Sequence, residues 1–313
     1  MSGARKKPPK KIRPGDAVRA AFERACLLEL EALKPGNVHV FADGHGMTVS
    51  DFRTSAEAAS AAIARDGLTV GERISAAVSA SVAAVKCNTN LGIVLLAAPL
   101  VHAALEASGK ATSEAKYRAA VAGVLKGLTI EDAEHAFAAI REAKPAGLGK
   151  AIRHDVNSRA TATLVTAMRA AAKRDRIAYQ YANSFADVFE TGLPALRDGL
   201  RRFDKMDKAQ AWATTGVFLA FLGRYPDSHI LRKHGEKAAE QVRSEASEIA
   251  QGFAHTDEPE RMAWVLTAFD TELKSRGINP GTSADLTVAT LLAASLLDIV
   301  APRTAGRKGG LAP

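Results

Sequence analysis

The chain has few of the residues that build β-sheets. Aromatic residues make up 5% of its 313 residues, and runs of alternating valine, isoleucine, threonine and tyrosine are missing. Alanine is abundant, and hydrophobic residues reach 47%, enough to bury a substantial core. We therefore predict an all-α protein, with one large bundle-like domain of many helices around a buried central helix.

Cysteine is scarce, and leader or anchor segments are not evident. Cys26 and Cys87 are the only cysteines, and their spacing matches neither a disulfide framework nor a metal site. The N-terminal segment lacks the apolar core of a signal peptide, and on inspection no stretch approaches a membrane span. We therefore expect a cytoplasmic protein with no membrane partner.

Positive charge is concentrated at the two ends of the chain. The formal net charge is +8, and basic residues gather before the first predicted helix and after the last: Arg5, Lys6, Lys7, Lys10, Lys11, Arg13, Arg303, Arg307 and Lys308. The body between them is close to neutral, whereas nucleic-acid binding needs a basic face on the folded part. We predict a basic disordered tail at 1–14, a helical domain at 15–301 and a flexible tail at 302–313, with nucleic acid an improbable partner.

Two polar turns beside helix ends are the first candidates for a binding site. A predicted helix over 16–33 carries Glu29 in its last turns and stops at the turn 34–39, Lys-Pro-Gly-Asn-Val-His. The second turn, at 88–92, reads Asn-Thr-Asn-Leu-Gly and opens an apolar helix predicted at 91–107. Unpaired amides and the helix dipole favour an anion at such ends, so we interpret the turns as two walls of one site.

Two later segments have similar chemistry. The segment 226–235 combines Asp227 with Arg232, Lys233 and a histidine, while 280–286 reads as a glycine-containing turn into the final helix. Each feature also has a purely structural explanation. Lysine-proline-glycine is a common helix stop, and asparagine, aspartate, threonine and serine are common helix caps. The arginines beside Asp175 could equally form ordinary surface ion pairs.

These motifs together resemble a known family. "E-x-x-x-x-KPGNVH", "NTNLGI-LL-APL" and "NPGTSADL" are similar to segments of the triphosphoribosyl-dephospho-CoA synthase family, over roughly residues 16 to 300. The segments around Lys150 and Asp175 resemble a divergent subgroup found in archaea and in one-carbon metabolism gene clusters. The chain also departs from better-known members, which have histidine and lysine at the positions of Asn90 and Leu91.

The resemblance implies an enzyme, a pentosyltransferase that uses ATP and a phosphorylated cofactor precursor. Synthases of this family join C1 of the ATP ribose to a hydroxyl of dephospho-CoA, keep the triphosphate and release adenine. Magnesium is the expected cofactor. The acceptor, the length of the transferred phosphate chain and a homo-oligomeric state stay open. The alternatives are ribosyl or phosphoribosyl transfer to a methanopterin-like one-carbon carrier, and a non-catalytic nucleotide- or RNA-binding helical protein.

The resemblance also implies roles for individual residues. Lys34 would neutralise phosphate, and Glu29 would act as the base or stabilise positive charge on the reacting carbon. The catalytic set is Glu29, Asp227 and Asp285, and the last two would also hold magnesium. The expected nucleotide contacts are Lys34, Gly36, Asn37, His39, Asn88, Thr89, Asn90, Lys150, Asp175, Arg176, Arg232, Lys233, Gly281, Thr282 and Ser283.

Overall fold

A computed structural model describes residues 13–107 and 112–301 of the chain. These residues form fourteen α-helices, one short π-helical turn, one short 3₁₀ turn and no strands, which confirms the predicted all-α class. The tails predicted at 1–14 and 302–313 lie outside the described residues, apart from residues 13 and 14. Pro14 begins the first helix.

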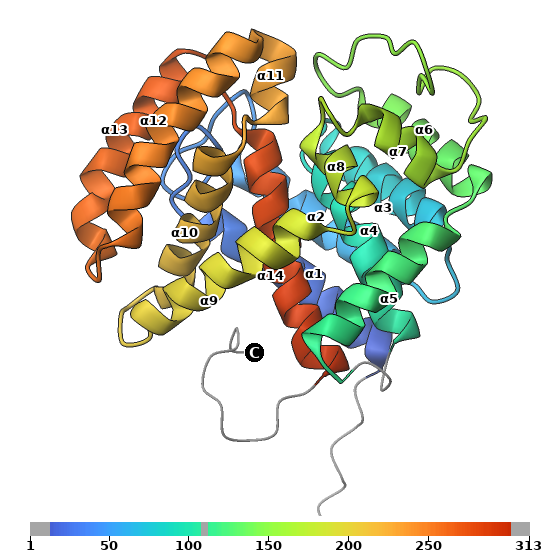
Figure 1. Ribbon diagram of the computed structural model, residues 1–313, viewed down its shortest axis with the longest axis horizontal. Helices are drawn as coiled ribbons and strands as arrows, with labels where there is room; N and C mark the ends of the chain where they lie inside the picture. The colour runs from blue at the N-terminus through green and yellow to red at the C-terminus, as the bar shows by residue number, and fades with distance from the viewer. Residues whose placement is uncertain (1–12, 108–111, 302–313) are drawn as a thin grey trace, which may run out of the picture.

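The helices follow one another along the chain with short connections in most places. Their bounds are α1 Pro14–Glu31, α2 Val49–Ile63, α3 Val70–Val85, α4 Leu91–Glu106, α5 Glu114–Gly127, α6 Ile130–Ala143, α7 Leu164–Ala171, α8 Arg176–Ala182, α9 Leu193–Arg202, α10 Ala209–Arg224, α11 Ser228–His234, α12 Glu236–Ala254, α13 Ala263–Ser275 and α14 Gly281–Val300. The longest irregular connection, residues 144–163, joins α6 to α7 (Figure 1).

Two apolar helices occupy the centre of the molecule. Helix α14 runs between a group containing α10, α12 and α13 and a group containing α3, α5 and α6 (Figure 1). It packs against α1, α4 and α10, and its side chains contribute to both hydrophobic clusters of the core. Helix α4 is buried along almost its whole length, as predicted for the stretch 91–107.

Helix α14 corrects the expectation that no stretch approaches a membrane span. By length and composition Gly281–Val300 could cross a bilayer. However, 67% of its most apolar window is buried inside the protein, where it contacts the neighbouring helices. Burial in the core accounts for its composition, because a central helix is apolar on all sides.

Local sequence signals explain where several helices begin. Thr48, Thr69 and Thr129 each accept a hydrogen bond from the backbone amide three residues later, and an acidic side chain at that position bonds back. These capping boxes satisfy amides that a helix start leaves unpaired. The structural role predicted for Asp132, reciprocal capping with Thr129, is confirmed.

Asp132 also holds α6 against α3. Its Oδ1 accepts a hydrogen bond of 2.7 Å from the backbone amide of Gly71. A Cβ atom at Gly71 would lie 2.5 Å from the Cα of Asp132, so only glycine allows this approach.

We expect Gly71→Ala to destabilise the protein by about 1–3 kcal/mol or more, because the added methyl group meets backbone that has no room to move. Urea unfolding followed by circular dichroism measures the effect. Gly123→Ala is the matched control: Gly123 also lies inside a helix, but its added Cβ would meet open space. That variant should be as stable as the parent or gain about 0.5–1 kcal/mol. Equal stability of the two variants would contradict this account of the α3–α6 contact.

Candidate active site

A cavity of about 510 Å³ lies where the N-terminal ends of α4, α8 and α14 meet. Residues near the end of α1 and the start of α11 also line it, and the 144–163 loop forms part of its wall. The volume is typical of a site for one drug-sized ligand. Segments that are far apart in the sequence therefore contribute to one enclosed space.

About half of the residues predicted for the site line this cavity. Those that do are Glu29, Asn37, Asn88, Thr89, Lys150, Asp175, Arg232, Gly281 and Asp285. Those that do not are Lys34, Gly36, His39, Asn90, Arg176, Asp227, Lys233, Thr282 and Ser283.

The turn after α1 is fastened to the turn before α14. The Asn37 side-chain amide donates a hydrogen bond of 2.8 Å to Oδ1 of Asn279. Gly36 has φ +81°, and a Cβ there would lie 2.8 Å from the Pro280 ring, so glycine is needed both for the turn and for the contact. Asn37 and Asn279 thus form one edge of the cavity, while Gly36 lies behind it.

Lys34 has a different environment from the one predicted. Its side chain is completely buried and donates hydrogen bonds to Glu29 Oε1, to Asn37 Oδ1 at 3.0 Å and to the Val38 carbonyl at 2.8 Å. An ammonium group has three protons, and all are used here. Lys34 therefore has no donor left for a phosphate, and its place in the structure is that of a counter-ion to Glu29.

Glu29 presents its carboxylate at the floor of the cavity. Burial raises the pKa of Glu29, and the neighbouring Lys34 ammonium opposes that rise. Burial likewise lowers the pKa of Lys34, and Glu29 opposes that change. Because each group stabilises the charge on the other, we treat the pair as ionised, with a negative Glu29 beside the ligand space.

His39 lies on the far side of the same turn, away from the cavity. Its Nε2 is 3.4 Å from Oδ1 of Asp270, which also accepts a 2.8 Å hydrogen bond from the Gly36 amide. Burial lowers the pKa of His39, and Asp270 opposes that change. Lys274 completes the group by donating to the other Asp270 oxygen at 3.0 Å. The predicted nucleotide contacts at Gly36 and His39 are therefore replaced by contacts that anchor the turn on α13.

The turn before α4 contributes two of its three predicted residues. Asn88 caps the helix, with Oδ1 accepting from the Leu91 amide at 3.2 Å, and it lines the cavity. Thr89 also lines it; the residue is only 9% exposed, and its hydroxyl has no hydrogen-bond partner within the described part of the chain. Asn90 points away and donates to the Ser81 hydroxyl at 2.9 Å, which fastens α4 to α3.

Asp285 reaches the cavity from the first turn of α14. Its carboxylate lies directly against Gly92, the second residue of α4, where a Cβ would overlap Oδ2. No hydrogen bond or ion pair joins the side chain of Asp285 to any of the described residues. Burial raises its pKa well above the ordinary value, and the nearby charges of Asp227 and Glu29 add to the rise.

Asp227 does not share this position. Its Oδ1 accepts from the backbone amides of His229 and Ile230 at 2.8 and 3.2 Å, and Oδ2 accepts from the Ser283 amide and hydroxyl at 2.7 and 2.8 Å. These four bonds cap α11 and tie it to the start of α14. They also account for Ser283, so neither residue has the predicted place in the site.

The two aspartates predicted to hold magnesium are not brought together at the cavity. Asp227 is buried and fully hydrogen-bonded, so of the two only Asp285 lines the cavity. Within the described ranges, no cluster of three or more histidine, cysteine, aspartate or glutamate side chains could hold a metal ion. Thr282 is buried outside the cavity with an unpaired hydroxyl, so the start of α14 offers the ligand space only Gly281, Ala284 and Asp285.

Asp175 and Arg232 form an ion pair on the cavity wall. Asp175 caps α8 by accepting from the Ala178 amide at 3.0 Å, and its other oxygen accepts from Arg232 Nη1 at 2.8 Å. The Nε of Arg232 is buried without a partner among the described residues. Arg232 lines the cavity, but this unpaired donor is itself covered by protein.

The neighbours of that pair lie outside the cavity. Arg176 makes a bidentate pair with Asp187, at 2.6 and 2.8 Å, and its guanidinium stacks between the rings of Tyr179 and Tyr225. Lys233 is exposed to solvent on α11. The nucleotide contacts at Arg176 and Lys233 stay predictions: here Arg176 stabilises α8, and Lys233 is exposed to solvent.

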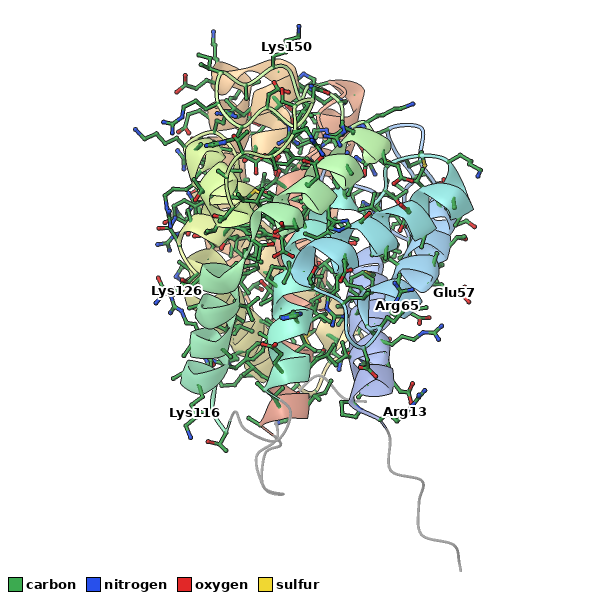
Figure 2. The ribbon with its side chains drawn as sticks, turned by 90° about the vertical axis from the view of Figure 1, so that its right-hand side faces the viewer. Arg13, Glu57, Arg65, Lys116, Lys126 and Lys150 are labelled. Atoms are coloured by element: carbon green, nitrogen blue, oxygen red, sulfur yellow. The ribbon has the colours of Figure 1, made fainter. Side chains whose placement is uncertain are left out.

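The opening of the cavity is basic. Lys150 and Arg153 lie on the 144–163 loop, and Arg174 lies just before α8; none forms an ion pair with a residue that the structure describes. Figure 2 places Lys150 at the end of the molecule opposite Arg13. Asp155 holds the loop in shape by accepting from the Ala151 and Asn157 amides at 2.6 and 2.8 Å.

Sequence reasoning missed several residues of this site. Gly92 and Asn279 lie inside the quoted motifs but were given no role, although both line the cavity. His229, two residues after Asp227, also lines it and packs beside Gly281. Burial lowers the pKa of His229 to about 4, and the nearby positive charge of Arg232 contributes. Arg153 and Arg174 had no motif to mark them, because exposed arginines are common in any sequence.

Comparisons with known proteins bear on the family and the fold. A family model described as "ATP:dephospho-CoA triphosphoribosyl transferase" matches residues 16–303. No match was found among the curated proteins. A crystal structure from Archaeoglobus fulgidus, described provisionally as a triphosphoribosyl-dephospho-CoA synthase, is similar in fold. It has a TM-score of 0.56 and 23% sequence identity, over 78% of this chain and 97% of that one.

We expect Lys34→Met to lower the free energy of unfolding by about 3–5 kcal/mol, because Glu29 would stay buried without its cation. Chemical denaturation measures the loss. Lys233→Met is the control, since Lys233 is exposed and forms no ion pair within the described residues.

The double variant Glu29→Gln with Lys34→Met distinguishes the stability lost by leaving a charge unpaired from the stability lost by changing the packing. It should lose less stability than Lys34→Met alone, because no buried charge is left unpaired. If Lys34→Met were as stable as Lys233→Met, the buried pair would not have the role described.

Proposed function

The chain belongs to the ATP:dephospho-CoA triphosphoribosyl transferase family, and we propose that the cavity at the ends of α4, α8 and α14 is where it carries out that family's reaction. The enzyme transfers the ribose of ATP, with its triphosphate, to a hydroxyl of the acceptor and releases adenine. Membership of an enzyme family leaves a non-catalytic RNA-binding role without support. Two free cysteines fit the cytoplasmic location that we also propose.

The observation that carries the proposal is the arrangement of charge in the cavity. The negative carboxylate of Glu29 and the carboxyl group of Asp285 line the cavity, together with cations that form no ion pair with the described residues. Ribosyl transfer needs both, because positive charge develops at the anomeric carbon while the attached triphosphate is strongly negative. The negative Glu29 would stabilise that carbon and accept the proton of the incoming hydroxyl.

The triphosphate is proposed to lie at the opening and not on the Lys34 turn. Lys150, Arg153 and Arg174 line the cavity and have no carboxylate partner among the described residues. Arg232 lines it too, with its guanidinium paired with Asp175. Hydrogen bonds from such cations to phosphate oxygens are about twice as strong as neutral ones. The cations therefore supply what Lys34, fully occupied by Glu29, does not.

Magnesium would enter with the nucleotide. Mg²⁺ usually keeps several waters and binds one or two carboxylates together with substrate phosphates. The Asp227–Asp285 pair does not offer a cage for it, since Asp227 is fully hydrogen-bonded. We therefore assign the roles of Glu29 and Asp285 without a protein-held metal.

The acceptor is proposed to be dephospho-CoA, as the family description states. One observation favours a second candidate. Leu91, where better-known members have a lysine, lines the cavity close to Ile93 and Leu95. An apolar surface in place of a cation suits an acceptor that presents an uncharged ring there. A precursor of a methanopterin-like one-carbon carrier, as expected for the divergent subgroup, is such an acceptor.

The direct experiment measures adenine release from ATP in the presence of each acceptor. We expect adenine, and neither phosphate nor pyrophosphate, to appear in step with consumption of the acceptor that the enzyme uses. Dephospho-CoA and a methanopterin precursor distinguish the two candidates. Release of phosphate with no adenine, or no reaction with either acceptor, would overturn the proposed reaction.

We expect Gly92→Ala to lower the turnover number for adenine release by about 100-fold, because the new methyl group displaces the Asp285 carboxylate and displacements near 1 Å have effects of that size. Gly123→Ala serves again as the helix-glycine control and should keep full activity. Circular dichroism checks that both variants are folded. Full activity in Gly92→Ala would show that the position of Asp285 does not matter for the reaction.

A further inference from the structure

Four carboxyl groups line the cavity, and they have different partners. Glu29 is paired with Lys34, and Asp175 is paired with Arg232. Asp155 accepts hydrogen bonds from two backbone amides, which lower its pKa. Asp285 alone has neither a cation nor a hydrogen-bond donor within the described part of the chain. Among the described residues, three of the four therefore have a cation or hydrogen-bond donors as partners, and Asp285 has neither.

The charged groups that face Asp285 come from every element packed around it. Helix α1 contributes Glu29, α11 contributes Asp227 and Arg232, and the cap of α8 contributes Asp175. Three of these groups are acidic, and Arg232 is already paired with Asp175. Lys34, in the turn after α1, is a second nearby cation and is already paired with Glu29. The positive N-terminal end of α4 opposes their effect, but no amide of that turn donates to the carboxylate. The surroundings therefore favour a neutral, protonated Asp285.

A protonated carboxyl group has a clear use in this reaction. When the bond between C1′ of the ribose and N9 of adenine breaks, its electron pair stays with the base. The base is a poor leaving group unless a ring nitrogen receives a proton. His229 is a weak alternative donor, because burial keeps its imidazole neutral near pH 7.

We propose that Asp285 is the acid that protonates the departing adenine, while Glu29 is the base that receives the proton of the acceptor hydroxyl. This inference rests on the proposed transfer reaction. The acceptor oxygen forms a bond to C1′ as the bond from C1′ to N9 breaks. One proton passes from Asp285 to adenine and one from the hydroxyl to Glu29, so adenine leaves neutral. Solvent then returns a proton to Asp285 and removes one from Glu29.

The positions of the two carboxyl groups support the roles of Asp285 as acid and Glu29 as base. Gly92 allows the Asp285 carboxyl to lie against the backbone of α4, at the cavity and away from any donor. Lys34 holds Glu29 from the opposite side, outside the cavity. Two carboxyl groups whose environments favour different protonation states are a recurrent arrangement for acid and base.

The test compares substrates whose bases do and do not need a proton. N7-methylated ATP carries a positive purine, which leaves as a neutral base without help. With ATP, Asp285→Asn should lower turnover by about 100- to 10,000-fold, the usual contribution of a general acid. With N7-methylated ATP it should stay within a few-fold of the parent enzyme. Glu29→Gln should lose activity with both substrates.

The pH dependence of turnover is a second readout, and it does not require the enzyme to accept the methylated substrate. With ATP, turnover of the parent enzyme should fall as pH rises through the raised pKa of Asp285, because the ionised form has no proton to donate. The residual activity of Asp285→Asn should lack this alkaline fall. Equal losses with ATP and its methylated form, or an alkaline fall that persists in Asp285→Asn, would overturn the assignment.

The stability of Asp285→Asn provides the folding control. Since the side chain of Asp285 makes no hydrogen bond with the described residues, the variant should unfold at the same denaturant concentration as the parent or higher.

The activity measurements also separate the failure of the proposed reaction from the failure of the proposed acid. A parent enzyme that releases no adenine from ATP contradicts the proposed reaction. An active parent whose Asp285→Asn variant is unimpaired contradicts only the role of Asp285.

Discussion

The buried ion pair between Lys34 and Glu29 is the contact on which the site depends. Lys34 bonds to Glu29 on α1 and to Asn37 and Val38 in the following turn. It therefore sets the direction of the turn as well as the charge of the carboxylate. Taking two charges out of water costs several kcal/mol per ion, and such a pair persists only when every proton finds a partner. Lys34 meets that condition, so it determines how the carboxylate of Glu29 is held at the cavity.

Close backbone contacts then bring the remaining parts of the site together. Gly36 lets the turn after α1 touch Pro280, and Gly92 lets the start of α4 touch Asp285. Asp227 ties α11 to α14 through Ser283. Each contact joins elements that are far apart in the sequence. The result is a cavity with fixed acidic groups at its floor and cations on a loop at its opening, an arrangement suited to transferring a polyphosphorylated sugar.

The fold was more predictable from the sequence than the site. Alanine-rich helical periodicity and the absence of strand patterns were enough for the all-α class, and the capping box at Thr129 was readable as a local pattern. The motif segments do meet at one cavity, but the direction of single side chains depends on distant partners. Lys34 and Asp227 have the chemistry of ligand-binding groups in the sequence, and only the structure shows that Glu29 and Ser283 are their hydrogen-bond partners. Asp270, which accepts a hydrogen bond from the Gly36 amide 234 residues away, lies in none of the motifs found in the sequence.

The structure of the protein with a non-reacting ATP analogue would test the central claim most directly. The account predicts the ribose C1′ between the carboxyl groups of Glu29 and Asp285, and the triphosphate against Lys150, Arg153, Arg174 and Arg232. Lys34 should remain bonded to Glu29. A triphosphate bound to the Lys34 turn, with the ion pair broken, or a nucleotide bound away from this cavity would contradict it.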